Sequence, residues 1–564
     1  MQEELLIAKT EKKVYDLLPH APETMAATLF VIGMSAYYLW RMFVITPQHE
    51  ELESYFLFIN NGPLYSAINW PSPNNHIGYS VLSAFLNYLG NNYIGLRGVS
   101  YVCAISNLIM VYRICQKYFI HAMPFGAMVL YASMQVVSDF AVQGRGYTLA
   151  TFCFLLALYC VTEICKSGES KKIHTITFVI CVVYGVYTTP SSVYRALPLC
   201  LTALVYLFIN GFRSRKVYSS DSENIYLKKL NSFIVSIGIS IFVCFMLYTV
   251  IWLMVGAREL VRTEGSAFFG ETDMTVLVRN PVQALGTGIQ YMVDQRRMSI
   301  GDVDLFRDMF LTWLVDLLNF MIPGMWLILL GFIISGLAIM ITECVRHFEY
   351  SRTVLNLMVI INIGFILLVL AATHNLPSLR GLGYGSFIMT ICICSTFEKL
   401  TNVTVRVYNQ YFVSDGKQPN AHNENEYVKG TGKWYDGIGV YTPVVLILLM
   451  FILRLTDKTY TSQVDTREND ILNAMYIADI AYKKNPCVLD EDQDYLLNFA
   501  FGIDCNKTDV TGSDVVILDR NMMEPGYNGE YLSRFYQVYQ TIDWDYLDTM
   551  HIQYENDSII LYTK

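Results

Sequence analysis

The sequence contains few charged residues. Only 16% of its 564 residues are Asp, Glu, Lys or Arg, whereas a soluble protein carries about 25%. Hydrophobic residues make up 53%, and the 40 Tyr, 31 Phe and 7 Trp suit a chain with many membrane–water boundaries. The formal charge of −9 supplies no basic face, which argues against a nucleic-acid partner. These shortages indicate a polytopic membrane protein.

Patterned cysteines are also missing. The chain has 13 Cys but no CxxC and no Cys/His array, so nothing in the sequence suggests a structural zinc site or an iron–sulfur cluster. Eleven of the 13 lie in or beside hydrophobic segments, where cysteine acts as a small buried hydrophobe. Only Cys487 and Cys505 share a soluble region, and they could form a disulfide if that region faces an oxidising compartment.

Eleven hydrophobic segments approach the length of about 20 residues that a transmembrane helix needs. The predicted spans lie near 25–45, 95–114, 124–142, 148–165, 173–189, 194–212, 232–255, 319–342, 354–373, 382–400 and 438–455. The apolar stretch 77–90 is only about 14 residues long, which favours an interfacial or re-entrant helix. The first hydrophobic run ends in Trp40-Arg41 without a small-residue cleavage site, so we expect a retained span and not a signal peptide.

The distribution of Lys and Arg predicts the orientation, because these residues collect in cytoplasmic loops. With the N-terminus inside, the cytoplasmic pieces are consistently basic, and the opposite loops are longer and more acidic. We therefore expect a cytoplasmic N-terminus and an extracytoplasmic C-terminus. The segments that face outward are then 46–94, 143–147, 256–318 and the tail from about 457.

Two domains follow from this arrangement. Residues 1–456 are expected to form an all-α polytopic transmembrane domain, which includes a polar cytoplasmic loop at 401–437. Residues 457–564 have an ordinary soluble composition, with a helix-like stretch at 468–484 and strand-like stretches at 515–518 and 559–562. They predict a small extracytoplasmic α/β domain.

Acidic residues follow the first span directly, in the stretch HEELE at 49–53. A carboxylate at the lipid–water boundary could take a proton from a substrate as a general base, and either Glu50 or Glu51 could have this role. The alternative is that both are ordinary solvated charges of a loop.

Three outward-facing arginines could together hold an anionic head group. Arg145 lies between two glycines in QGRGY (143–147), where we expect the glycines to leave room around a guanidinium fork that suits phosphate. Arg380 lies in LRGLGY (379–384) and Arg195 in PSSVYR (190–195). Any one of them alone could be an interfacial anchor, but three on one face predict a phosphate site.

These motifs, in this order, resemble a known superfamily. HEEL (49–52), PNNH (73–76) before an apolar helix, LR (96–97) at the start of a span, QGRGY and LRGLGY are similar to motifs of the GT-C polytopic glycosyltransferases. The resemblance covers roughly 25–400 and is closest to the protein O-mannosyltransferase-like and aminoarabinose-transferase-like branch. It implies transfer of a sugar from a polyprenyl-phosphate donor, outside the membrane, to a glycan, lipid or protein acceptor.

The resemblance also implies roles for single residues. Glu50 stands where the family has a catalytic Asp, with Glu51 as its acidic neighbour. His76, Arg145 and Arg380 match the family's motif positions and would bind the donor phosphate. Arg195 is expected to join them from its place on the same face, and Asn75, Tyr147 and Tyr384 are expected to line the substrate pocket. The chain departs from the family in having Glu in place of Asp, which leaves the choice between Glu50 and Glu51 open. It also has Ile77 where proline is usual, and no direct Arg-Tyr pair in the late motif.

No cofactor is certain from the sequence. A divalent cation (Mg, Mn, Ca or Zn) is an alternative source of positive charge at the site, with Glu51 and His76 as ligands. Acids of the loop 256–318 could join them, namely Asp294, Asp302, Asp304 and Asp308. The alternative for these four is again a solvated loop.

The sequence therefore predicts a polyprenyl-phosphate-sugar-dependent glycosyltransferase in a plasma membrane, and its composition suggests a bacterial one. One alternative is a transporter or flippase of lipid-linked glycans, which would show ionisable residues in the middle of its spans and repeat symmetry. Another is a surface receptor or scaffold whose external tail is the working part. The charges cluster at one surface and no internal repeat is visible, which favours the enzyme.

Overall fold

The computed structural model describes residues 21–564 with several gaps. The gaps are 70–74, 216–223, 295–302, 347, 349, 413–433, 462–465, 490, 505–508, 521–538 and 540. Cys505 lies in one of them, so its predicted pairing with the buried Cys487 falls outside the described residues.

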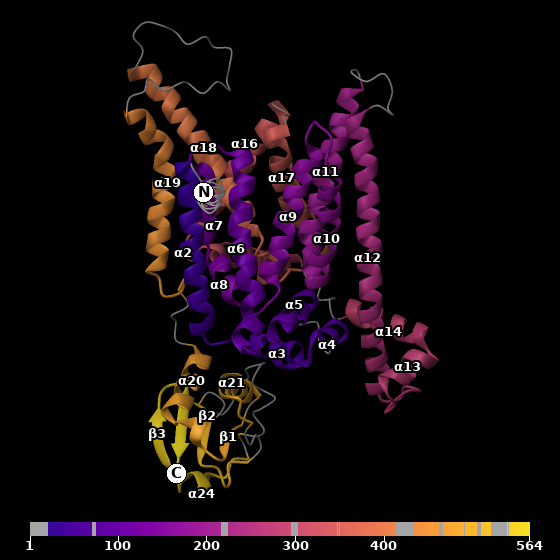
Figure 1. Ribbon diagram of the computed structural model, residues 1–564, viewed down its shortest axis with the longest axis vertical. Helices are drawn as coiled ribbons and strands as arrows, with labels where there is room; N and C mark the ends of the chain where they lie inside the picture. Colours follow the sequence, from indigo (N-terminus) through magenta and orange to yellow (C-terminus); the bar gives the residue numbers. More distant parts are fainter. Residues whose placement is uncertain are drawn as a thin grey trace, which may run out of the picture.

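Long helices run side by side and form a bundle (Figure 1). Within the part of the chain that the structure describes, seven helices are long and apolar enough to cross a membrane, and the chain is therefore a multi-pass membrane protein. They are α2 (Pro22–Val44), α6 (Asn92–Tyr118), α9 (Tyr147–Cys165), α11 (Val193–Ser214) with the preceding turn η2 (Pro190–Ser192), α12 (Ile225–Arg262), α16 (Trp326–Arg346) and α17 (Tyr350–Thr373).

Other apolar helices complete the bundle. They are α7 (Met123–Ala132), α8 (Gln135–Val142), α10 (Lys172–Thr188), α18 (Gly385–Phe412) and α19 (Trp434–Leu455). Helical structure thus occurs in each of the eleven segments predicted to span the membrane, but the number of spans stays a prediction.

Two of the predicted spans have a different shape from the one expected. The segment 124–142 is not straight, because α7 and α8 meet at a bend of 65°. The segment 319–342 is interrupted, because α15 (Val303–Met321) ends and α16 begins only at Trp326. Pro323 and Gly324 lie in the gap, and Gly324 has a φ of 75°, which favours glycine.

Groups from the end of the transmembrane domain stabilise the bend between α7 and α8. A bend leaves carbonyl groups without their helical donors, and such groups need other partners in a membrane. The hydroxyl of Tyr460 donates to the carbonyl of Ala132 at 2.7 Å, and Nε of Arg454 donates to the carbonyl of Ser133 at 3.4 Å. The bend is therefore held by residues more than 300 positions away.

Short helices cover one end of the bundle. They are α3 (His49–Leu57), η1 (Ile59–Asn61), α4 (Pro63–Ile68) and α5 (Ile77–Asn87), with α13 (Asp273–Arg279) and α14 (Pro281–Asp294) at the same end (Figure 1). With 11 residues, α5 is about 16 Å long and too short to cross a membrane. The turn η3 (Leu379–Leu382) precedes α18.

The C-terminal region is a small α/β unit at this end (Figure 1). It contains α20 (Arg467–Ile477), η4 (Ile480–Tyr482), β1 (Pro486–Val488), α21 (Glu491–Phe501), β2 (Val515–Asp519), α24 (Trp544–Leu547), β3 (His551–Glu555) and β4 (Ile559–Thr563). The sheet order is β1-β2-β4-β3, with β1 and β2 parallel and the other two pairs antiparallel. Leu561 faces Ile517 across the centre of the sheet. The predicted strands are confirmed, and they form the core of the sheet because their residues are buried.

Candidate active site

Helix α3 carries the two candidate carboxylates, and its first turn directs them to different surroundings. A capping box starts the helix, because the backbone N–H of Gln48 donates to Oε2 of Glu51 at 3.0 Å while the Gln48 side chain accepts from the third helical residue. Consecutive helix residues point about 100° apart. Glu51 therefore points into the protein while Glu50, whose side chain is 38% exposed, lies at its surface.

Glu51 forms a buried ion pair with Arg97 of α6. Nε and Nη2 of Arg97 donate to the two oxygens of Glu51, each at 2.8 Å, and both side chains are at most 2% exposed. Nη1 of Arg97 donates to the carbonyls of Met42 and Ile45. The pair thus ties α3 to α6 and to the end of α2. Because both oxygens of Glu51 accept hydrogen bonds from Arg97, the role of Glu51 is to hold α3 in place.

The glycines on either side of Arg145 bring the backbone close to its neighbours. The N–H of Gly144 donates to Oε1 of Glu51 at 2.5 Å, and a Cβ at Gly144 would lie 2.5 Å from the side chain of Leu96. A Cβ at Gly146 would lie 2.9 Å from Nδ1 of His76. The expectation that these glycines leave room around the arginine was wrong, because their space is filled by other residues.

Glu50 lies between two arginines that are far apart in the sequence. Its Oε2 contacts Nη1 of Arg380, in η3, and lies 4.0 Å from Nη2 of Arg145. Nη1 of Arg145 also donates to the backbone carbonyl of Glu50 at 3.2 Å and to the hydroxyl of Ser54 at 3.0 Å. Arg145 is almost fully buried, whereas Arg380 is 39% exposed. One carboxylate and two guanidinium groups therefore meet at the surface.

His76 borders the same cluster in its neutral form. Its Nδ1 accepts the N–H of Gly146 at 2.9 Å, so the proton of the neutral ring lies on Nε2. Burial, together with the guanidinium groups of Arg145, Arg380 and Arg195, lowers the pKa of His76 well below its usual 6.5. Neutral His76 can donate one hydrogen bond from Nε2.

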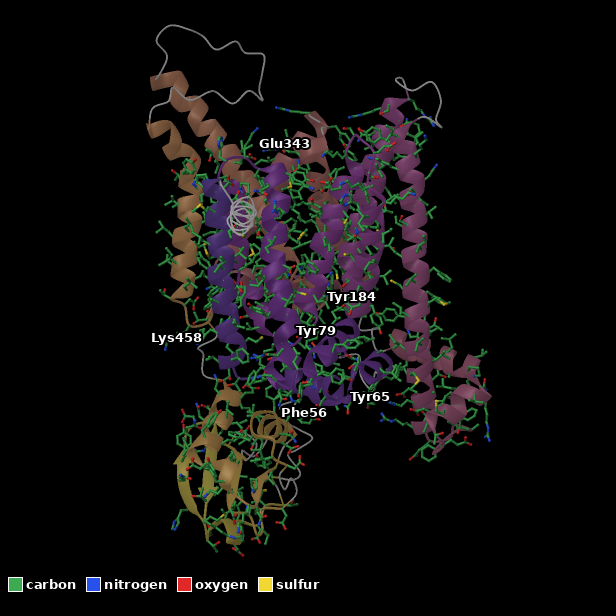
Figure 2. All side chains as sticks on the ribbon, in the orientation of Figure 1. Phe56, Tyr65, Tyr79, Tyr184, Glu343 and Lys458 are labelled. Carbon is green, nitrogen blue, oxygen red and sulfur yellow. The ribbon has the colours of Figure 1, made fainter. Side chains whose placement is uncertain are left out.

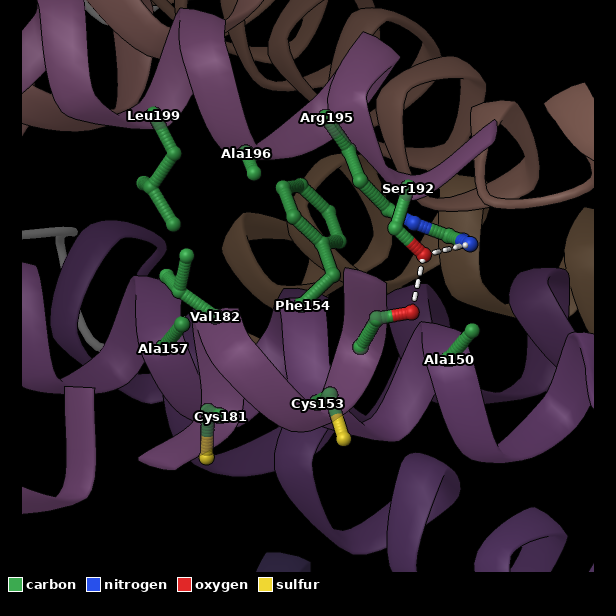
Figure 3. Close-up of a pocket in the computed structure, with 11 residues that line it drawn as sticks. Ala150, Cys153, Phe154, Ala157, Cys181, Val182, Ser192, Arg195, Ala196 and Leu199 are labelled. Carbon is green, nitrogen blue, oxygen red and sulfur yellow. Dashed lines mark hydrogen bonds between the residues drawn. The ribbon is translucent and has the colours of Figure 1, made fainter. Parts of the chain in front are cut away.

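Arg195 and Tyr384 form a second, buried part of the site. Nη2 of Arg195 donates to the hydroxyl of Ser192 at 2.8 Å, and its guanidinium group lies 5.1 Å from the ring centre of Tyr384. Figure 3 shows Arg195 and Ser192 at a cavity whose other walls are apolar residues of α9, α10 and α11. The cavity volume is about 20 Å³, which is room for one water. Tyr384 is 1% exposed, and its hydroxyl donates to the carbonyl of Tyr194. Its ring is therefore fixed in place and packs against the buried side of Arg195.

The other two residues expected in the pocket have packing roles. The side-chain amide of Asn75 donates to the carbonyls of Ser66 and Asn69, and its oxygen accepts the hydroxyl of Ser80 at 2.8 Å. These bonds connect Asn75 with α4, with the residue that follows α4, and with α5. The ring of Tyr147 stacks on Phe140, with 4.7 Å between the ring centres, and lies nearly perpendicular to the ring of His76, also at 4.7 Å.

The acids of the loop 256–318 do not join this cluster where the structure describes them. Asp304 and Asp308 are 85% and 70% exposed and pair with Arg307. Asp302 lies outside the described residues, as does the side chain of Asp294. Within the described ranges, no group of three or more His, Cys, Asp or Glu side chains could hold a metal ion. A divalent ion with Glu51 and His76 as ligands stays a prediction, and the present partners of both groups offer it no preformed site.

The motifs predicted four of the residues that meet here, namely Glu50, His76, Arg145 and Arg380, whereas the roles of Arg97 and Ser54 were not predicted. An arginine within the first turns of an apolar helix needs a counterion, and this was the available signal for Arg97. Ser54 lies one turn after Glu50, which places both on the same face of α3.

The sequence matches no protein-family model, and no curated protein matches it either. The solved structures that are similar in fold include three glycosyltransferases. ArnT from Cupriavidus metallidurans bound to undecaprenyl phosphate has a TM-score of 0.49 at 11% identity, over 95% of this chain and 97% of that one. The oligosaccharyltransferase AglB from Archaeoglobus fulgidus, in complex with an inhibitory peptide and a dolichol-phosphate, has a TM-score of 0.42 at 10% identity, over 88% and 69%.

The arabinosyltransferase EmbB from Mycobacterium smegmatis has a TM-score of 0.38 at 11% identity, over 88% of this chain and 44% of that one. All three are glycosyltransferases of the GT-C type, the superfamily that the motifs of this sequence resemble. TM-scores below 0.5 support no argument about activity. A proposed function therefore depends on the geometry of the site.

Proposed function

We propose that this protein is a membrane glycosyltransferase that moves a sugar from a polyprenyl-phosphate donor to a hydroxyl group of an acceptor. The observation that carries the proposal is the contact of Glu50 with Arg380 and Arg145 at one end of a bundle of apolar helices. The cluster combines a partly exposed carboxylate, which can take a proton, with two cations, which can hold a phosphate. Its place at the end of the bundle suits a substrate that is part lipid and part polar.

The reaction divides between these groups. The carboxylate of Glu50 takes the proton of the acceptor hydroxyl while the hydroxyl oxygen forms a bond to the anomeric carbon of the sugar. The bond between that carbon and the phosphate oxygen breaks, and the phosphate leaves with the electron pair. Arg380 and Arg145 stabilise the negative charge that develops on it.

The ion pairs of the site also suggest an order of events. Arg380 and Arg145 hold the carboxylate of Glu50, and a phosphate would compete for the same guanidinium groups. A donor that binds the arginines would release Glu50 to accept a proton. Neutral His76 could then donate a hydrogen bond to the phosphate from Nε2.

The donor class also fits the surroundings. Arg195 adds positive charge near His76, which suits the phosphate of the donor, and the apolar helices of the bundle suit its polyprenyl chain. The acceptor would be a glycan, lipid or protein outside the membrane, and the predicted orientation places the site on that side of a plasma membrane. The sugar that we propose is a hexose or a pentose.

The test is a transfer assay with synthetic polyprenyl-phosphate sugars and the purified chain in nanodiscs. Glu50→Gln keeps the shape of the side chain and removes the base, so we expect turnover to fall by roughly 10²- to 10⁴-fold. Glu53→Gln, on the same helix, is the matched control and should transfer sugar at the wild-type rate. Full activity of Glu50→Gln would contradict the proposed role of this carboxylate. Movement of the intact donor across the bilayer without transfer would instead identify a flippase.

A further inference from the structure

Aromatic side chains join the C-terminal unit to the helix that carries Glu50. The ring of Phe56 in α3 stacks on Tyr495 of α21 with 4.9 Å between the centres and 15° between the planes. Phe499 of α21 packs its ring against the edges of Tyr55 in α3 and Tyr93 in α6, each at 5.0 Å. We call these five residues the aromatic joint. Figure 2 labels Phe56 at the border between the bundle and the C-terminal unit.

Hydrogen bonds fix the same contact. The side-chain amide of Asn92 donates to the carbonyl of Phe499 at 3.1 Å, and the hydroxyl of Tyr55 donates to the oxygen of the Asn92 side chain at 2.9 Å. Phe499 is 3% exposed and Tyr55 is 4% exposed. Two hydrogen bonds thus connect the backbone of α21 with the side chain of Tyr55. Because Phe499 and Tyr55 are also buried, the aromatic joint is well packed.

The helix α3 is too short for its two ends to move separately. Its nine residues form about two and a half turns over about 13 Å. The Glu51–Arg97 pair holds the first turn, and the aromatic joint holds the last. Between them lies Ser54, whose hydroxyl accepts a hydrogen bond from Arg145. A tilt of α3 at the joint would therefore change the position of Glu50 relative to Arg145 and Arg380.

We infer that the C-terminal unit positions the catalytic helix, with Tyr495 and Phe499 as positioning residues that act through α3. This inference rests on the proposed function, because it assigns the joint an effect on the transfer reaction. Turnover then depends on whether α21 is seated against α3. A change of about 1 Å in a reacting group costs up to roughly 10²-fold in rate, so a small movement of α3 is sufficient.

The experiment compares full-length variants by hydrogen exchange and by kinetics. Tyr495→Ala removes the stack on Phe56, and Phe499→Ala removes the contacts to Tyr55 and Tyr93. Loss of one aromatic pair should raise the exchange of the α3 amides by roughly 3- to 10-fold. Helix α2 should be unchanged in both variants, and α6 should be unchanged in Tyr495→Ala, which leaves the contact of Phe499 with Tyr93 in place. The kcat for transfer should fall by roughly 10-fold or more. The KM for the donor should stay within about twofold, because the arginines belong to other segments.

Two control variants make the result specific. Tyr495→Phe keeps the ring and should restore the slow exchange of α3 and the wild-type kcat. Tyr482→Ala removes an aromatic residue of the same unit that is 87% exposed, and it should change neither quantity. Because Phe499 is buried and its loss could unfold the C-terminal unit, Tyr495→Ala, whose side chain is only partly buried, is the deciding variant.

The inference is overturned if α3 exchanges at the wild-type rate in both alanine variants, or if it exchanges faster while kcat keeps its wild-type value. Exchange also separates the two proposals. A wild-type chain that transfers no sugar would refute the glycosyltransferase, whereas faster exchange of α3 in Tyr495→Ala would still show that α21 holds this helix.

Discussion

Adjacent carboxylates of α3 differ because their surroundings differ. Glu51 is buried and has a hydrogen-bonded guanidinium group across both oxygens, so the loss of Arg97 would leave a buried charge, which costs about 3–5 kcal/mol. Glu50 is partly exposed and shares two arginines that can also bind a phosphate. The same residue type thus supports the fold at one position and can take part in chemistry at the next.

Arg380 is the clearest probe of donor binding. Its side chain is partly exposed, and the contact described for it is with Glu50, so Arg380→Ala should leave the fold intact. We expect the Kd for a polyprenyl-phosphate sugar, measured by titration in nanodiscs, to rise roughly 10- to 100-fold, because a charged hydrogen bond contributes about 1.5–3 kcal/mol. Arg380→Lys should recover only part of the affinity, because the fork geometry is lost. Arg307→Ala, at an exposed position, is the control, and equal affinity of the two alanine variants would refute this role.

His76 gives the stability a pH dependence. The pKa of His76 is well below 6.5 in the folded protein, whereas an unfolded chain has the usual value of about 6.5. Below pH ~6.5 the unfolded chain therefore binds a proton that the folded protein excludes, and the free energy of unfolding falls as the pH falls. Above this pH both states are neutral and the contribution is constant.

The variant His76→Asn should flatten this part of the profile, because its side-chain oxygen can still accept the N–H of Gly146. The measurement is thermal unfolding of the purified protein in detergent between about pH 5 and 8. His551→Asn, at an exposed position of β3, should keep the wild-type profile. A loss of stability in acid that is equally steep in His76→Asn would assign it to other groups.

The sequence predicted the main residues of this site but not the contacts that hold them in place. Short motifs placed Glu50, His76, Arg145 and Arg380 on one face, and the structure brings them together. The distinction between Glu50 and Glu51 could not be predicted, because it depends on which carboxylate meets Arg97 in space. The space around the glycines beside Arg145 was predicted wrongly for the same reason, since the atoms that fill it come from α3, α6, α10 and His76.

At the scale of elements, the bend between α7 and α8 shows what a hydropathy pattern omits. The run 124–142 is mostly apolar, with Gln135 and Asp139 as its strongly polar residues and no proline or glycine near Ser133, so hydropathy predicts one straight span. The chain bends there because Tyr460 and Arg454 supply donors to the carbonyls that the bend leaves without partners. Periodicity and length predicted the helices well, but neither could predict hydrogen bonds from residues in distant segments.

Tyr460→Phe tests this account of the bend. The change removes the hydroxyl that donates to Ala132 and leaves a buried carbonyl without this bond, so the free energy of unfolding should fall by about 1–3 kcal/mol. Unfolding in denaturing detergent, followed by circular dichroism, measures the change. Tyr482→Phe, at an exposed position, should be neutral. An unchanged stability of Tyr460→Phe would mean that the bend does not depend on this bond.

At the scale of the whole molecule, the orientation in the membrane is the central expectation. The first external loop, α13, α14 and the C-terminal sheet lie at one end of the bundle (Figure 1), as the prediction of outward-facing segments requires. A reporter active in the cytoplasm should therefore work after Leu400, and a reporter active outside should work after Lys564. A reporter fused after Lys171, in a predicted cytoplasmic loop, is the control for the first. Activity of both main fusions on the same side would show that the number of spans between them is not odd.

The contact between Glu50 and Arg380 also has a consequence for synthesis. These residues are separated by 330 positions, whereas Glu51 and Arg97 are separated by only 46. At about 5–20 residues per second, Arg97 is made within roughly 2–9 s of Glu51, but Arg380 follows Glu50 only after roughly 16–66 s. The ion pair that holds the first turn of α3 can thus form early, while Glu50 meets Arg380 only after most of the membrane domain has been inserted. A nascent chain that stops short of η3 would have only the first turn of α3 held and no complete site, so an unfinished copy could not act on the proposed lipid-linked donor.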